Sequence, residues 1–212
     1  MDNVELQEGQ TKQESLLGCT IQANLKWSAH FEHLKCRLSS RLAALSNLKF
    51  SATFDVKKRV ADGIFTSVLS YCLPLFGGSE ACNIKDLQVL QNRAAQIVCK
   101  APSRCNRVKL FDKVKWLTVN QLIAYQTLVA IYKIRESREP EYMSKIVNNT
   151  SRGNRILRTN TRLSLAQKSF TFRGVQLWNQ LPLDLRTTDT AIGYFKTKAK
   201  EWVIDNVPRF LD

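Results

Sequence analysis

His30, His33 and Cys36 are the residues of this chain with the widest chemical repertoire, and they form an H-x-x-H-x-x-C pattern. Imidazole and thiolate side chains bind transition metals and serve as bases and nucleophiles. On a helix, positions three residues apart are rotated by roughly 60°, so this spacing does not direct three side chains at one ion. We therefore predict no metal site here, and we expect His30 to form a hydrogen bond with the backbone.

Carboxylates, the other residue type able to support catalysis, are mostly spaced singly along the chain, and no Asp-Asp pair occurs. A two-metal polymerase centre needs clustered carboxylates. Gly77–Gly78 lacks the following Lys-Ser/Thr of a phosphate-binding loop, and Cys99 and Cys105 have no matching second pair for zinc. The sequence thus predicts no catalytic residue, no metal and no cofactor, and the chain alone is not expected to be an enzyme.

Basic residues carry the strongest signal. The chain holds 32 Lys and Arg against 18 Asp and Glu, a formal charge of +14, which favours a polyanionic partner. The stretch 142–183 contains no acidic residue and half of this net charge. Its basic residues are Lys145, Arg152, Arg155, Arg158, Arg162, Lys168 and Arg173. Interspersed Asn, Ser and Thr side chains suit contacts with phosphate and sugar, so we predict that residues 152–173 bind nucleic acid.

Two further features of the sequence admit a functional and a structural interpretation. Phe170, Phe172 and Trp178 have the flat rings that stack on bases, although packing in a core is the commoner role of such residues. The run Lys57-Lys58-Arg59 has the charge for phosphate contacts, although three charges near a helix start usually form a solvated face. We keep Lys57, Lys58 and Arg59 as candidate contacts.

The composition indicates a folded protein of one or two small domains, because 44% of the residues are hydrophobic and 24% charged. The acidic, polar start of the chain does not resemble a secretory signal. We therefore expect an intracellular protein of nucleus or cytoplasm with reduced, mostly buried thiols. The uncharged stretches 63–79 and 117–132 carry Pro, Gly and amide residues and are predicted to be buried helices, with no membrane contact.

Hydrophobic periodicity predicts mainly α structure. Helices are expected at 27–48, 55–75, 84–100, 118–136 and 140–147, around 110–111, and around 195–203 before Pro208. The inward stripe of the second helix is predicted to be Val56, Val60, Ile64, Val68, Tyr71 and Leu75. A short N-terminal β-hairpin is expected from Asn3–Gln7 and Leu16–Gln22, and short extended pieces from ILRTN and SFTF in the basic segment. The predicted organisation is 1–25 hairpin, 26–135 helical bundle and 136–212 basic C-terminal region.

Several strings of the sequence resemble one known family. LLGCTIQANLKWSAH (16–30) resembles the segment that follows the palm in non-LTR retrotransposon reverse transcriptases of the jockey-like type. Other strings agree with that family in order and spacing: SVLSYCLPLFGG (67–78), IKDLQVLQNRAAQIV (84–98), LFDKVKWLTVNQLIAYQTL (110–128), FRGVQLWNQLPLDLR (172–186) and FKTKAKEWVIDNVPRFLD (195–212). The resemblance covers the chain from about residue 15 to its end.

The resemblance implies a thumb and C-terminal region without the palm motif, with 1–25 as a remnant of the palm edge and 26–135 as a thumb-like bundle. The family's Tyr-x-Asp-Asp turn would lie upstream of Leu17–Gly18 and is absent, and Leu16 stands where an aromatic residue often occurs. Lys35, Arg37 and the 57–59 cluster would contact a template–primer. The expected function is a non-catalytic fragment of an RNA-directed DNA polymerase that binds RNA or DNA backbone without sequence preference. The alternative is a domesticated helical module that binds protein.

Overall fold

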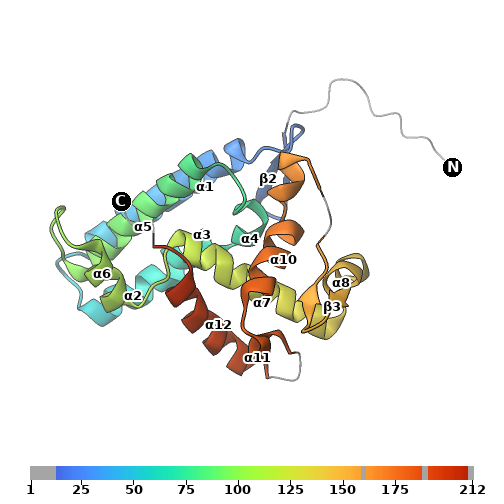
Figure 1. Cartoon of the computed structure of the whole chain (residues 1–212). Coiled ribbons are helices and arrows are strands. Elements are labelled where there is room, and N and C mark those ends of the chain that lie inside the picture. Colours follow the sequence, from blue (N-terminus) through green and yellow to red (C-terminus); the bar gives the residue numbers. More distant parts are fainter. Residues whose placement is uncertain (1–12, 159–160, 188–190, 210–212) are drawn as a thin grey trace.

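Helices build most of this protein, as a computed structural model shows for residues 13–158, 161–187 and 191–209 (Figure 1). Two short antiparallel hairpins, β1–β2 near the N-terminus and β3–β4 in the basic segment, complete the secondary structure of these residues. The predicted class, mainly α with a short N-terminal β-hairpin, is confirmed. No described helix has the length and hydropathy of a membrane span.

The N-terminal hairpin pairs β1 (Gln13–Leu16) with β2 (Cys19–Gln22). Its two-residue turn places Leu17 at φ 49° and Gly18 at φ 79°, both in the left-handed region that such tight hairpins require. The hairpin was predicted, but its first arm was expected at 3–7, which lies outside the described residues. The second arm was expected over Leu16–Gln22, but Leu16 ends β1 and Leu17–Gly18 form the turn, so only Cys19–Gln22 is confirmed.

Helix α1 (Ser28–Asn47) confirms the helix predicted at 27–48, and its hydrophobic residues at intervals of three and four form a buried stripe of Phe31, Leu34, Leu38, Leu42 and Leu45. The residue at its N-cap position, Trp27, provides no side-chain cap. Instead the Gln22 side chain on β2 accepts hydrogen bonds from the Ala29 N–H (3.2 Å) and the Ser28 hydroxyl (2.7 Å). A side-chain acceptor at this place satisfies a helix-start N–H group that has no partner within the helix. The hairpin and α1 are thereby fixed to each other.

The second predicted helix is present as α2 (Phe54–Ala61), a π-helical turn η1 (Asp62–Thr66) and α3 (Ser67–Ser70), and its predicted inward face is wrong. The buried positions are Lys57, Ala61, Phe65 and Leu69, one residue along from the expected stripe, and Val56 and Tyr71 are half exposed. Beyond Gly63 the sequence is apolar nearly all round, so periodicity could not choose the face there, and the charged run in α2 gave no reason to expect Lys57 inside.

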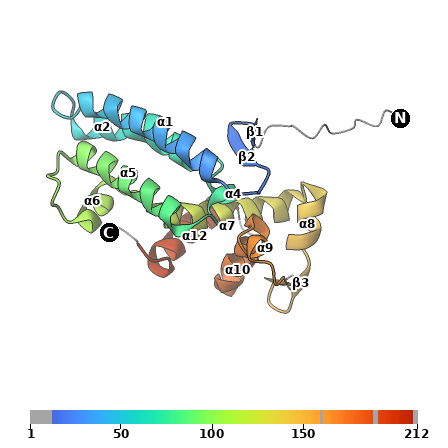
Figure 2. The same ribbon diagram turned by 90° about the horizontal axis from the view of Figure 1, so that it is seen from above.

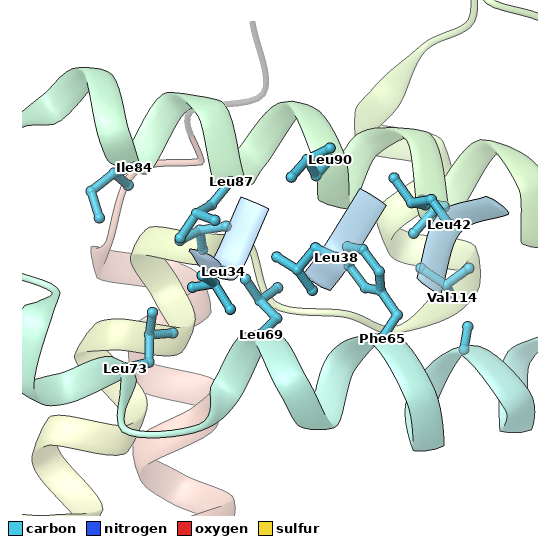
Figure 3. Close-up of a cluster of buried hydrophobic side chains, with 14 of the residues drawn as sticks. Leu34, Leu38, Leu42, Phe65, Leu69, Leu73, Ile84, Leu87, Leu90 and Val114 are labelled. Atoms are coloured by element: carbon cyan, nitrogen blue, oxygen red, sulfur yellow. The ribbon is translucent and has the colours of Figure 1, made fainter. Parts of the chain in front are cut away.

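The chain then breaks earlier than Pro74, where the helix was expected to end. Cys72 adopts a left-handed conformation (φ 51°), and a one-turn helix, α4 (Leu73–Phe76), follows it. Figure 3 shows the resulting first core, in which leucines of α1, Phe65 and Leu69 meet Ile84, Leu87 and Leu90 of α5 (Ala81–Cys99). Helix α6 (Arg107–Val114) closes this core at one end, where a short helix was predicted.

Helix α7 (Val119–Ser137) matches the helix predicted at 118–136 and begins with a capping box between Thr118 and Gln121. Its first turns pack in the first core through Val119 and Ile123, and the rest packs in a second core from Ala124 onward. The two cores therefore meet inside α7, whereas the domain boundary was predicted at the end of this helix. Figure 1 shows α7 running between the two groups of helices.

The second core joins α7 to α8 (Glu141–Val147), α10 (Phe170–Gln180), α11 (Leu183–Arg186) and α12 (Ile192–Asn206). Tyr132 stacks on Phe195 with 4.3 Å between ring centroids, and Trp178 stacks on the same ring at 5.9 Å. The predicted extended piece SFTF is wrong. Ser169 instead caps α10 by accepting the Phe172 N–H, so this stretch is the start of a helix.

All six cysteines lie among the described residues and are free thiols. The expectation that most are buried is wrong, because only Cys19 is buried and Cys36 and Cys82 are exposed. The terminal helix was predicted around 195–203 and is present as α12, which ends before Pro208 as expected.

Candidate nucleic-acid interface

The basic segment forms a small hairpin that projects arginines into solvent. Strand β3 (Thr150–Ser151) pairs with β4 (Arg155–Ile156), and the turn between them places Gly153 at φ 74° and Asn154 at φ 53°. We call residues 150–156 the basic hairpin. Arg152, Arg155 and the following Arg158 are exposed. None of these three guanidinium groups forms an ion pair with another described residue, so each is available to an external anion.

Three side chains from α10 and α11 hold the backbone of this hairpin. Asn179 accepts the Ile156 N–H (2.8 Å) and donates to the Ile156 carbonyl (2.9 Å). The Trp178 indole N–H donates to the Asn154 carbonyl at 3.3 Å, and Arg186 Nη1 donates to the Gly153 carbonyl at 2.8 Å. Because these are contacts to backbone, they fix the position of the turn while its own arginines stay free.

Arg162 and Lys168 extend the exposed basic surface along the chain. Arg162 precedes the short helix α9 (Ser164–Gln167), and Lys168 follows it. The Lys168 carbonyl accepts a hydrogen bond from Arg173 Nε at 3.1 Å. Only the backbone of Lys168 takes part in this contact, and its side chain is exposed. Five of the six predicted residues of this segment are thus exposed: Arg152, Arg155, Arg158, Arg162 and Lys168.

Arg173 is the exception, and its predicted phosphate contact is corrected by its surroundings. Its guanidinium donates to the Lys168 carbonyl and, through Nη2, to the Pro74 carbonyl at 2.6 Å. Burial lowers the pKa of Arg173 to about 10, which still leaves it cationic at neutral pH. Arg173 therefore links α10 to the segment before Gly77 and is not free to bind phosphate.

The predicted contacts on α1 and α2 are more dispersed. Lys35 forms ion pairs with Glu32 (2.6 Å) and Asp86 (3.1 Å), and hydrogen bonding to Glu32 and then Asp86 raises its pKa. Lys58 pairs with Asp62 at 2.8 Å. Arg37 and Arg59 are exposed, and neither has an ion pair within the described residues. The two lysines already have anionic partners, which makes these helices a weaker candidate surface.

Lys57 does not belong to any surface, so its prediction as a phosphate contact is wrong. Its side chain is 1% exposed, and its ammonium donates to the carbonyls of Lys49 (3.4 Å) and Ile97 (3.5 Å). Lys49 lies two residues after the end of α1, and Ile97 lies in the last turn of α5, where its carbonyl also accepts the Lys100 N–H at 3.2 Å. Burial, followed by the charge of Lys100, lowers the pKa of Lys57.

The histidine and cysteine side chains do not form a catalytic or metal-binding group within the described residues. His30 is buried, and its Nδ1 accepts the Thr20 N–H at 3.3 Å, which confirms the predicted backbone hydrogen bond. Burial, followed by the neighbouring thiol of Cys72, raises the pKa of Cys19 to about 11, so Cys19 is a thiol at neutral pH. No group of three potential metal ligands occurs among residues 13–158, 161–187 and 191–209.

Comparison of the chain with protein-family models, with curated proteins and with solved structures found no match in any of the three.

Sequence reasoning missed the residues that support the hairpin. Trp178 was considered for base stacking, but it is fully buried in the second core and also lies under Arg135, whose guanidinium carbon is 5.0 Å from its ring centroid. Asn179 and Arg186 had no role assigned. Both belong to the string WNQLPLDLR, which contains no pattern that indicates this role. The residues they contact in the hairpin are 23 and 33 positions away, so no local signal connects them.

Proposed function

We propose that this chain binds the phosphate backbone of RNA or DNA without sequence preference, as a non-catalytic module related to the thumb and C-terminal region of a reverse transcriptase. The observation that carries the proposal is the basic hairpin, a backbone turn fixed by Trp178, Asn179 and Arg186 that presents unpaired arginines. Phosphate contacts of this kind position a protein on nucleic acid but do not read its sequence.

The test is the salt dependence of binding. For a B-form DNA duplex, each phosphate contact contributes about 0.9 to the slope of log affinity against log salt concentration. We expect substitution of Arg152, Arg155, Arg158 and Arg162 by Gln to lower the affinity about 100-fold or more at low salt and to reduce this slope by about 3.6.

A matched control removes the same four charges elsewhere. Lys85, Arg93, Arg104 and Lys115 are exposed and lie outside the basic segment, and their substitution by Gln leaves the basic hairpin intact. At physiological salt, where the Debye length is about 8 Å, we expect the control to change affinity by less than about fivefold, since distant exposed charges are screened. Equal losses in the two variants would show diffuse attraction by net charge and would contradict the assignment of the site.

A second candidate function, binding to a protein, is favoured by the apolar residues around the N-terminal hairpin. Leu16 and Leu17 are 62% and 82% exposed at its turn, and Leu25 beside it is 56% exposed. Contiguous exposed apolar residues mark interaction surfaces. Capture of a partner that is insensitive to salt and is abolished by Leu16→Ser with Leu17→Ser would support this function. Loss of nucleic-acid binding in the same variant would argue that the leucines serve the first function.

A further inference from the structure

A cleft of about 600 Å³ opens where the two cores meet, and neither core fills it. Its walls come from three stretches far apart in sequence: the β2–α1 connection (24–28), the segment from Leu75 to the first turn of α5, and the start of α9 and α10 (164–170). Figure 2 shows α4 between α1 and the α9–α10 pair at this place. A volume of this size is typical of sites for small ligands.

The lining combines flat apolar surfaces with hydrogen-bonding groups. Trp27 and Phe170, which are far apart in the sequence, contribute aromatic rings to the lining, and Leu165 contributes an aliphatic side chain. Both rings are half-buried, so each packs against a core and also borders the cleft. Hydroxyl and amide side chains complete the lining: Asn24, Ser28, Ser79, Asn83, Ser164 and Ser169. Rings beside amides and hydroxyls suit a planar heterocycle with polar edges.

The walls of the cleft are fixed relative to each other. Arg173 joins them by donating to both the Pro74 carbonyl (2.6 Å) and the Lys168 carbonyl (3.1 Å). Gly78 lies so close to the other wall that an added Cβ would be 2.0 Å from the Lys168 carbonyl oxygen. The cleft is therefore a preformed cavity, and a ligand that enters it does not have to order its walls.

The charges at the cleft favour an anion. Lys26 and Lys168 border it, and the only acidic residue among its lining residues is Glu80, at the start of α5. The first turns of α1, α5 and α10 also border the cleft, and helix N-termini add partial positive charge. Lys168 belongs to the exposed basic segment as well, so the cleft is continuous with the proposed interface.

We propose that this cleft binds an unpaired nucleotide, with its base between Trp27 and Phe170 and its phosphates at Lys26 and Lys168. The inference rests on the proposed function, because the backbone on either side of that nucleotide would follow the basic segment. It adds a preference that phosphate contacts alone do not provide: the protein favours nucleic acid with a single-stranded end over a blunt duplex.

The experiment compares three probes: a blunt duplex, the same duplex with a four-nucleotide single-stranded extension, and the duplex with an abasic extension. The last two carry the same phosphates, so their difference isolates the bases. We expect the extension with bases to bind about tenfold more tightly than the abasic one, as stacking of a base on aromatic side chains provides. We expect Asn83→Leu with Ser79→Leu, which fills the cleft, to remove this difference and leave the blunt duplex unaffected.

A second variant keeps the test independent of steric filling. Trp27→Leu with Phe170→Leu removes the rings, and a thermal unfolding midpoint and circular dichroism spectrum like those of the wild type show that it is folded. It should also lose the tenfold difference, and the control Phe50→Leu, an exposed ring distant from the cleft lining, should retain it. Binding to all three probes without a base-dependent difference would overturn this inference alone. Absence of binding to any probe would overturn the proposed function as well.

Discussion

At the scale of the residue, the same side chain type has opposite roles depending on its surroundings. Lys57 and Lys58 are neighbours in sequence, yet one ammonium is buried against two helix ends and the other pairs with Asp62 on the surface. The basic character of the run therefore says little about its function. A buried cation with only carbonyl partners instead contributes to the stability of the first core.

Lys57→Ala is expected to lower the free energy of unfolding by about 2 kcal/mol, because it removes buried methylene groups and leaves the Lys49 and Ile97 carbonyls without this donor. Lys58→Ala, the matched control, should cost about 0.5 kcal/mol or less, as expected for an exposed i,i+4 ion pair. Urea denaturation measures both. If Lys57→Ala left stability unchanged and weakened nucleic-acid binding, the structural role of Lys57 would be wrong and its role as a phosphate contact would be supported.

His30 makes stability depend on pH. Burial, followed by the charges of His33 and Arg37, lowers its pKa from the ordinary 6.5. Below pH 6.5 the unfolded state therefore takes up a proton that the folded state does not, so stability is lost as the pH falls through the lowered pKa.

His30→Gln, which keeps an acceptor for the Thr20 N–H, is expected to lose less stability than the wild type between pH 7.5 and pH 5. Urea denaturation at a series of pH values checks this. Arg41→Gln provides the control on the same helix, because Arg41 is exposed and is not among the groups that lower the pKa of His30, and this variant should retain the wild-type slope. An identical pH dependence in the wild type and His30→Gln would refute the assignment.

At the scale of the element, the basic hairpin is too short to be stable by itself. Two paired residues in each strand cannot form an independent sheet, so its conformation depends on the side chains of α10 and α11. Asn179 contributes most directly, because its amide satisfies both backbone groups of Ile156 in the manner of a neighbouring strand.

Asn179→Ala is expected to cost about 1–2 kcal/mol in stability and to accelerate hydrogen exchange at the Ile156 amide, since that N–H loses its acceptor. If the hairpin binds nucleic acid, affinity should also fall, although no charge has been removed. Gln180→Ala, at the next and exposed position, is the control and should behave as the wild type. Unchanged exchange at Ile156 would show that the hairpin does not need this support.

At the scale of the whole molecule, α7 and Arg173 join the two cores. Helix α7 contributes buried side chains to both, and Arg173 connects α10 of the second core to Pro74 beside the first. A helix shared by two cores cannot keep its structure when either one unfolds. The two cores should therefore unfold as one cooperative unit.

Single-tryptophan variants test this cooperativity. Trp116 packs against the first core and Trp178 lies within the second, so each reports on one of them when the other tryptophans are replaced by Phe. We expect coincident urea midpoints from both reporters. Arg173→Ala should lower both midpoints together, with a loss of about 1–3 kcal/mol in the free energy of unfolding, because two backbone carbonyls lose a charged donor. Separate midpoints in the otherwise unaltered chain would show two independent folding units.

The sequence by itself determined the local elements whose signals lie within one or two turns. The Thr118–Gln121 capping box, the α1 stripe from Phe31 to Leu45 and the end of α12 before Pro208 were all predictable. Such features depend on neighbours three or four residues away, which periodicity and capping rules describe directly.

Only the tertiary structure decided which face of α2 and α3 is buried and which basic residues reach solvent. The uncharged stretch after Gly63 is compatible with several orientations, and packing of Phe65 and Leu69 in the first core selected one of them, which also turns Lys57 of α2 inward. Lys57 and Arg173 were predicted to contact phosphate, but both bind backbone carbonyls inside the protein. The partners Ile97 and Pro74 lie 40 and 99 residues away in sequence. Contacts of such range leave no local pattern, so the supported hairpin and the cleft could be found only in three dimensions.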